Sequence, residues 1–371
     1  DTTEASIGQN VNVRATGSQA QVVPGTPNAE TLGVEVSATS DINAISFSGA
    51  VAGAKKAGVG VSNTDIGNFD KTLASIGSGS VVNADGADAG VKVSAASTQD
   101  MSNVSVSGAA ATEGTGVAGV LGVIASANLV SASVGDDVSI TSQGDAEVQA
   151  SNDTTTVMIA GGVAGGKEVG VGAAFAVNAL WNQTQATIGS GASIDAKKDT
   201  IVAADGSETA ATAVVAGAGG GKVGVAGALS INAMFTDTEA TIAEGAKVNT
   251  NSAFQSDEQT VALTATDDTV IVGVAGGGAG GGKVGVGAAA DTAVLIKTVK
   301  ASIADGVAAD GTEVDAVKSV QVTATSTENI ISVTAGFAGG GSVGVGGAVS
   351  LGIVSNTVAA HVGDAATVTS E

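Results

Sequence analysis

Residues 169–194 read VGVGAAFAVNALWNQTQATIGSGASI, and the layout of these residues recurs along the chain. The stretch has two parts, a long alternating segment and a short polar segment that leads into Ala-Thr-Ile-Gly. The same layout begins again at Val223, Val284 and Val343, and weaker copies begin at Ala57 and Thr115. Repetition of one layout along most of a chain indicates a repeat architecture.

A fixed inner spacing defines the repeat. In all six copies the first residue lies 19 positions before an Ile or Val: Ile76, Val134, Ile188, Ile242, Ile303 and Val362, with Ile7 as a seventh such landmark. Residues 51–371 therefore form tandem repeats of 54–61 residues in one elongated domain. Residues 1–50 form an irregular first repeat, whose loop contains Pro24 and Pro27.

The hydrophobic period is 2 throughout, which predicts an all-β chain. We expect a repetitive β-solenoid, a right-handed parallel β-helix in which each repeat divides into two or three coils. At about 4.8 Å per coil, six repeats would stack to roughly 60–90 Å. The glycine turns, such as 219–222 (Gly-Gly-Gly-Lys), leave open an antiparallel hairpin within each repeat.

The long segment also predicts which face is buried. Side chains alternate across a strand, and one face carries the larger residues Val223, Val225, Leu229, Ile231 and Phe235, with Gly227 and Ala233 between them. We expect this face to line the core. The opposite face has small residues, so it is either packed closely against another backbone or bare and available for lateral association.

Equivalent positions of stacked repeats lie above one another, which places Phe69, Trp181, Phe235 and Ile296 in one column. We expect this column to be internal. The position that follows carries Asp70, Asn128, Asn182, Thr236, Lys297 and Asn356. This polar position is interpreted as a corner at which the strand bends out to solvent.

Composition excludes several classes of function. A net charge of −22 argues against nucleic acid and anionic lipid as partners. No apolar run reaches the roughly 18–20 residues of a membrane-spanning helix, so we expect no membrane insertion of this segment. The chain has no Cys and hence no disulfide framework. Both ends break off within a repeat, which suggests an excerpt of a longer chain or a subunit covered by neighbours.

The cassette formed by residues 165–178 and 186–194, and again by 219–232 and 240–248, resembles repeats of very large secreted bacterial adhesins. These are the filamentous-haemagglutinin-like and leukotoxin-like adhesins of type V secretion. The resemblance implies a β-solenoid stalk at the bacterial cell surface, hence an extracellular location. Its partners would be neighbouring repeats, copies of the same protein, or the surface of a host or neighbouring cell.

Motifs for catalysis are weak. Residues 161–167 and 277–283 match the start of a phosphate-binding loop, but the following Ser/Thr and the helix are missing, so we interpret both as turns. A Ser–His–Asp triad would need His361, the single histidine, which we expect to be an exposed strand residue. Nothing marks a pair of glycosidase carboxylates. We therefore expect no enzyme, no catalytic residues and no cofactor.

Calcium is the one metal that the sequence leaves open. Ca²⁺ prefers clusters of oxygen ligands, and the acidic pairs Asp136–Asp137 and Asp267–Asp268 are the candidates. The glycine–aspartate repeat of calcium β-rolls is absent, which favours solvated acidic turns. The resulting hypothesis is a structural or adhesive segment of a surface filament or stalk. The alternative is a filament or surface-layer subunit that polymerises through uncapped solenoid ends.

Overall fold

The computed structural model describes residues 1–17, 20–21, 30–306 and 311–370. Pro24 and Pro27, with the loop predicted around them, lie outside the described residues. Within the described residues there are three sheets of seven strands each, and every pairing is parallel except that of β3 with β4. The one helical element among the described residues is a 3₁₀ turn, η1 (Ser252–Phe254). The predicted parallel β-solenoid is therefore confirmed.

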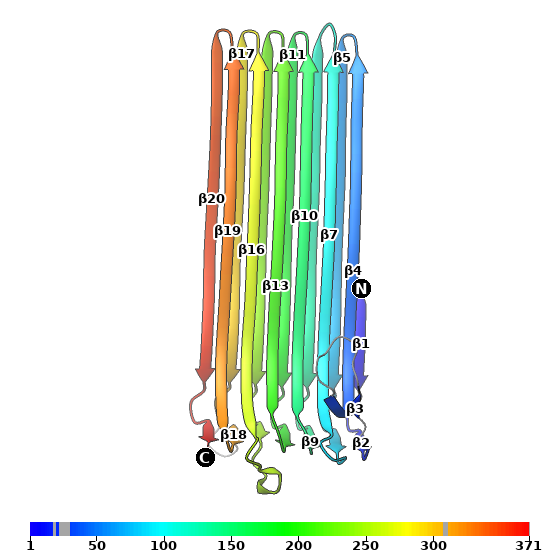
Figure 1. Ribbon diagram of the computed structural model, residues 1–371, viewed down its shortest axis with the longest axis vertical. Helices are drawn as coiled ribbons and strands as arrows, with labels where there is room; N and C mark the ends of the chain where they lie inside the picture. Colours follow the sequence, from blue (N-terminus) through cyan, green and yellow to red (C-terminus); the bar gives the residue numbers. More distant parts are fainter. Residues whose placement is uncertain (18–19, 22–29, 307–310, 371) are drawn as a thin grey trace.

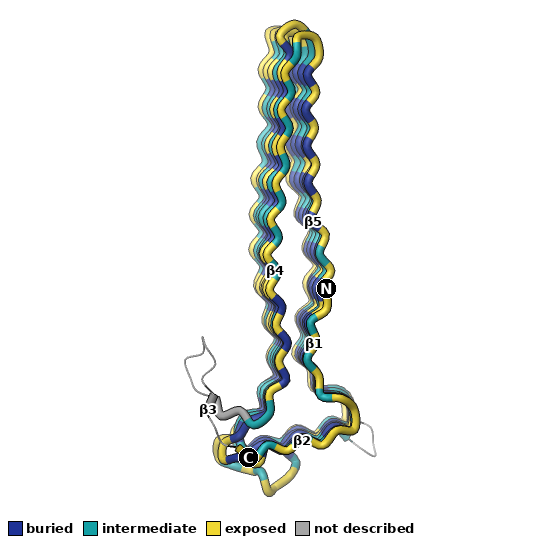
Figure 2. The backbone as a smooth tube through the Cα atoms, turned by 90° about the vertical axis from the view of Figure 1, so that its right-hand side faces the viewer, coloured by how far each residue is buried: buried dark blue, intermediate teal, exposed yellow. Residues whose placement is uncertain are grey.

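Two of the sheets are built from long strands that face each other (Figures 1 and 2). Sheet A contains β1 (Thr2–Ile7), β5 (Ala57–Ile76), β8 (Thr115–Val134), β11 (Val169–Ile188), β14 (Val223–Ile242), β17 (Val284–Ile303) and β20 (Val343–Val362). Sheet B contains β3 (Ala20–Gln21), β4 (Glu30–Ala54), β7 (Gly90–Ala111), β10 (Ala146–Gly166), β13 (Thr200–Gly220), β16 (Thr260–Gly281) and β19 (Ser319–Gly340).

The third sheet, which we call the base sheet, closes the far end of the sandwich with short strands (Figure 2). It contains β2 (Asn12–Ala15), β6 (Val81–Ala84), β9 (Ser139–Ser142), β12 (Ser193–Ala196), β15 (Lys247–Val248), β18 (Glu313–Ala316) and β21 (Thr367–Ser370). Each turn of the solenoid runs from a base strand along sheet B, around a tight turn that contains or follows glycine in all coils but the first, and back along sheet A.

One repeat therefore makes one coil, and the expected division into two or three coils per repeat is wrong. A strand of 20 residues extends over about 66 Å, whereas seven strands stack over only about 30 Å. The stack is thus about half the predicted height or less. The hairpin alternative is also wrong, because β10 pairs in parallel with β7 and β13 rather than with β11 across the glycine turn.

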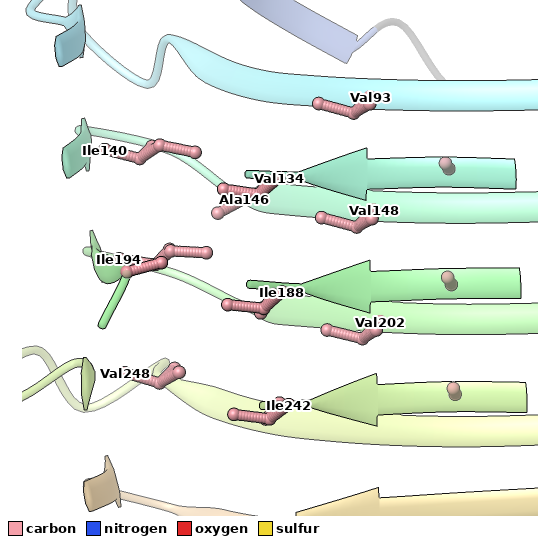
Figure 3. Packing of buried hydrophobic residues seen from close by; sticks show 14 of the residues in the cluster. Val93, Val134, Ile140, Ala146, Val148, Ile188, Ile194, Val202, Ile242 and Val248 are labelled. Carbon is pink, nitrogen blue, oxygen red and sulfur yellow. The ribbon is translucent and has the colours of Figure 1, made fainter. Parts of the chain in front are cut away.

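The landmark residues form a column in the hydrophobic core beside the base sheet, which we call the base core. Val134 pairs in register with Ile188, and Ile188 pairs with Ile242. They pack on Ile140, Ile194 and Val248 of the base sheet (Figure 3). Six of the turns that follow a landmark use a left-handed residue three positions later, which is Gly at 79, 191 and 245, Asn at 10, Asp at 137 and Ala at 365. The fixed spacing of 19 positions therefore corresponds to one long strand of sheet A, which runs from the turn at one end of the sandwich to the base core at the other.

Above the base, the face prediction for the long segment is wrong. In β14 the small residues point inward and the large ones outward: Ala226, Ser230, Asn232 and Met234 are buried, whereas Val225 is exposed and Leu229, Ile231 and Phe235 are partly exposed. Near the glycine turns the two sheets are too close for larger side chains. A Cβ at Gly172 would lie 2.2 Å from the backbone oxygen of Gly217.

Of the two alternatives left open for the small-residue face, close packing against another backbone is therefore confirmed. Small residues are required wherever backbone meets backbone. Bulky apolar side chains are displaced to the outside of sheet A, where Val59, Leu121, Phe175, Trp181 and Ile296 are exposed. The molecule thus has a thin, tightly closed interior and a broad apolar outer face.

Candidate functional site

The outer face of sheet A carries the column of large residues that the repeat spacing predicts. Trp181 pairs with Phe235 in register, and Phe235 pairs with Ile296. The rings of Trp181 and Phe235 stack with centroids 5.4 Å apart and planes 4° apart. Trp181 is 46% exposed and Phe69 is 69% exposed. The prediction that these residues form a column is correct, but the prediction that the column is internal is wrong.

A groove of about 530 Å³ follows this column from Ile296 on β17 to Phe69 on β5 and reaches Thr2 on β1. Ala127 lies between Phe69 and Trp181 in the register of the sheet and leaves space there. Polar side chains two positions further along the strands, Lys71, Gln183 and Asp237, line one side of the groove. Such a surface combines an aromatic platform with hydrogen-bonding groups, which is the composition of many contact surfaces.

The polar position next to the column is buried from β5 to β17, so its interpretation as a solvent corner is wrong there, whereas Asn356 on the edge strand β20 is exposed. Asp70, Asn128, Asn182, Thr236 and Lys297 are all at most 5% exposed. Three of them bond to residues of sheet B. Asn128 donates to Asn152 Oδ1 at 2.6 Å, Asn182 donates to Glu208 Oε1 at 3.1 Å, and Lys297 donates to the backbone oxygen of Asp267 at 2.7 Å. A polar layer thus crosses the middle of the sandwich between the two apolar cores.

The charged part of this polar layer involves three carboxylates and one amine. Lys297 on β17 and Asp267 on β16 have fully buried side chains, and Lys297 Nζ lies 2.6 Å from Asp267 Oδ1. Glu328 Oε1 on β19 lies 3.5 Å from the same amine. Glu208 on β13 is also buried. Buried charges require such pairing, because an isolated charge in a protein interior costs several kcal/mol or more.

Glu208 is the most perturbed group of the layer. Burial raises its pKa well above the ordinary value, and the charge of Asp267 raises it further. The hydrogen bond from Asn182 and the charge of Lys297 act in the opposite direction. Because these opposing effects are smaller, Glu208 tends to hold its proton. A protonated carboxyl beside a carboxylate is able to donate a hydrogen bond and to transfer a proton.

The calcium candidates do not come together. Asp267 is paired with Lys297, whereas Asp268 points to the opposite, exposed face of β16. Asp136 lies in an exposed turn, where its Oδ1 accepts a hydrogen bond of 2.9 Å from the backbone N–H of Ser190. Asp137 adopts a left-handed conformation in the same turn. Among the residues that the structure describes, no three His, Cys, Asp or Glu side chains are grouped as a metal site would need.

The other motifs are elements of the scaffold. Residues 161–167 and 277–283 end strands of sheet B and form the turns into sheet A, and no helix follows either one. Their interpretation as turns holds only for the last residues, since 161–166 belong to β10 and 277–281 to β16, and the turns themselves are 167–168 and 282–283. His361 lies on the exposed outer face of β20, as predicted. Within the described ranges, no helix is long and apolar enough to cross a membrane.

Sequence reasoning missed Glu208 and the pairing of Asp267 with Lys297. One signal was present: Lys297 occupies a position that carries Asn or Thr in most other repeats. The signal indicates a buried amine only if the face of the strand that carries Lys297 is known to point inward.

The fold and this site place the chain among the parallel β-solenoids. No protein-family model, curated protein or solved structure matches the sequence.

Proposed function

We propose that the chain is a structural or adhesive segment of a secreted bacterial surface filament or adhesin stalk, without catalytic activity. The observation that supports this most directly is the uninterrupted register of the coils. From β8 through β20, each full-length strand of sheet A pairs residue for residue with the preceding one, without a bulge. Each coil therefore presents a strand edge on which the next coil pairs in the same register, and the solenoid is lengthened by adding further repeats.

The chemistry of the chain agrees with a scaffold at the cell surface. Backbone hydrogen bonds run along the stack, and the columns of Ile, Val and Met side chains hold sheets A and B and the base sheet together. The net charge of −22 favours solubility and opposes nucleic acid as a partner. The resemblance of the glycine-turn cassette to type V secreted adhesins supports an extracellular location. The partners would be neighbouring repeats or another cell surface.

A second candidate is a filament or surface-layer subunit that assembles by itself. The observation that favours it is the pair of open sheet edges. Among the described residues, nothing pairs with the outer edge of β20, and only β1 (Thr2–Ile7) pairs with the outer edge of β5. Long unprotected edge strands are templates for a further strand. Since the small-residue faces are buried, lateral contacts would use the apolar outer face of sheet A instead.

Electron microscopy of the purified chain over a concentration series, with light scattering, separates the two candidates. Separate short bodies at every concentration support the stalk segment, whereas fibres that lengthen with concentration support self-assembly. In the second case, Leu351→Pro and Gly352→Pro on β20 test the edge, because neighbouring N–H groups of a strand point to opposite sides. One of the two should shorten the fibres, and the outer-face variant Trp181→Lys should not.

The location is tested on intact cells that express the parent chain. Protease treatment and antibody labelling should reach the segment without lysis of the cells. Labelling that requires lysis would contradict the proposed surface location.

A further inference from the structure

The interior of the solenoid places an amine directly against a carboxyl group, shielded from water. Lys297 extends from sheet A and Asp267 from sheet B, and both side chains are fully buried. The amine also donates to the backbone oxygen of Asp267 at 2.7 Å, to Thr269 Oγ1 at 2.9 Å and to the backbone oxygen of Thr327 at 3.2 Å. These contacts fix Nζ in one position beside the Asp267 carboxyl group.

The carboxyl group of Asp267 is held just as firmly. Its Oδ2 accepts a hydrogen bond of 2.7 Å from Thr238 Oγ1, and its Oδ1 accepts one of 3.2 Å from Thr269. Glu208, from the neighbouring coil, forms a hydrogen bond with Asp267. Its own carboxyl group is held by Asn182 at 3.1 Å. Two reacting groups held in contact, with a third group that carries a proton, are the elements of an acyl-transfer site.

We propose that Lys297 and Asp267 condense to form an intramolecular isopeptide bond, with Glu208 as the group that transfers the proton. This proposal does not depend on the proposed function of the chain, because it rests only on the geometry of the buried cluster. It assigns a covalent modification to the fold, and the reaction needs no cofactor and no other reactant.

The reaction balances within the three side chains. One proton passes from the Lys297 ammonium to the Asp267 carboxylate, which leaves a neutral amine and a neutral carboxylic acid. The amine lone pair attacks Asp267 Cγ, while Glu208 donates a hydrogen bond to the carboxyl oxygen and so stabilises the negative charge that develops there. Glu208 then gives its proton to the departing hydroxyl oxygen and takes one from the nitrogen, the C–O bond breaks, and one molecule of water leaves.

Burial favours this outcome over a lasting ion pair. A buried ion pair loses the hydration of both charges, and the attraction between them often does not compensate for that loss. Condensation removes both charges and leaves a neutral amide. The raised pKa of Glu208 favours the protonated form, which is the form that donates. The bond would join sheet A to sheet B across one coil and would close residues 267–297 into a ring.

The chain contains a built-in comparison on its surface. Lys222 Nζ and Glu168 Oε1 are also 2.6 Å apart, but both side chains are half exposed. Water hydrates that pair, and no third carboxyl group is hydrogen-bonded to it among the described residues. The two pairs therefore have the same amine–carboxylate distance, but only Lys297 and Asp267 are buried beside a proton donor. Only that buried pair should react.

Intact mass spectrometry of the purified, folded full chain under denaturing conditions tests the proposal directly. We expect a mass lower than that of the sequence by one water. Proteolysis should yield one branched peptide that contains both Asp267 and Lys297, and Lys222 should be recovered in unmodified peptides. The full sequence mass in a chain with the circular dichroism of a folded β-protein would overturn the proposal.

Variants separate the bond from the role of Glu208. Lys297→Met should keep the full mass, and so should Glu208→Gln, which retains the shape and the contact with Asn182 but has no proton to transfer. If Glu208→Gln still loses one water, the role assigned to Glu208 is wrong and the bond itself stands. Circular dichroism of each variant shows that it is folded before its mass is interpreted.

Discussion

Trp181 and Phe235 stack face to face across neighbouring coils on the outside of the solenoid, with ring centroids 5.4 Å apart. Leu180, the residue before Trp181, points the other way and is completely buried. The largest side chain of the repeat thus lies outside, and a medium-sized one lies inside. This arrangement reverses the usual distribution of size across a strand, because the two backbones approach each other closely.

The neighbouring residues Trp181 and Leu180 give the first prediction. Trp181→Ala should lower the free energy of unfolding by about 1–2 kcal/mol, since only part of the ring is buried and the stacked pair contributes about 0.5–1.5 kcal/mol. Leu180→Ala should cost more, about 2–5 kcal/mol, because it opens a cavity in the interior. Urea denaturation followed by circular dichroism measures both values.

Fluorescence provides an independent check of the same face, because Trp181 is the single tryptophan of the chain. Its emission should be quenched readily by acrylamide in the folded state. Emission that is protected from acrylamide, together with a larger loss for Trp181→Ala than for Leu180→Ala, would place the column inside and contradict the structure.

Glycines at the close approach of the sheets give a second prediction. Gly172→Ala on β11 should destabilise the fold by roughly 1–3 kcal/mol, since its Cβ would lie 2.2 Å from the backbone oxygen of Gly217 and the sheets would have to separate. Gly227→Ala on β14 is the matched control, because no heavy atom lies within 4 Å of its added Cβ. That change should be neutral or stabilise by about 0.4–1 kcal/mol. Equal losses for the two variants would argue against the close approach.

The strands, their parallel stacking and the landmark column were predictable because each depends on a period that is written in the sequence. Ile188 lies above Val134 and below Ile242, at the spacing that the repeat requires. Side-chain size did not predict which face of each long strand points inward. Size predicts burial where an interior is wide, and this interior narrows to backbone contact at Gly172 and Gly217.

The inverted assignment of the faces is also the reason that the buried cluster around Lys297 was not predicted. Lys297 follows Ile296, so placing Ile296 inside necessarily placed Lys297 outside. The partner Asp267 lies 30 positions earlier, across a glycine turn, and no local pattern connects the two. Their contact depends on how coil and turn lengths bring sheet A against sheet B, which periodicity alone does not specify.

The acidic turn at Asp136 gives a third prediction. Asp136→Ala should cost about 1 kcal/mol, since the backbone N–H of Ser190 loses its acceptor. Asp136→Asn should cost less, because the amide oxygen still accepts. Neither calcium nor a chelator should change the melting temperature of the protein, since Asp136 caps a neighbouring turn and Asp267 is paired with Lys297. A rise in melting temperature on addition of calcium would restore the calcium hypothesis.

The buried carboxyl group of Glu208 gives a fourth prediction, which concerns pH. Its pKa in the folded state is raised, whereas a glutamate in the unfolded chain titrates near 4.3. Between these two pKa values the folded state binds more protons than the unfolded state, so the free energy of unfolding decreases as pH rises. The loss begins above about pH 4, has a limiting slope of about 1.4 kcal/mol per pH unit, and stops once the pH exceeds the folded pKa.

Urea denaturation of the wild type and of Glu208→Gln across this range isolates the contribution of Glu208. The wild type should lose stability relative to the variant as pH rises, and the difference should become constant above the folded pKa. The sign holds whether or not Asp267 is joined to Lys297, because burial is the largest cause of the shift. Glu168→Gln is the control of opposite sign, since the hydrogen bond from Lys222 lowers the pKa of Glu168. If the difference in free energy of unfolding between wild type and Glu208→Gln does not vary with pH, Glu208 is hydrated. That result would contradict the burial of Glu208 in the polar layer.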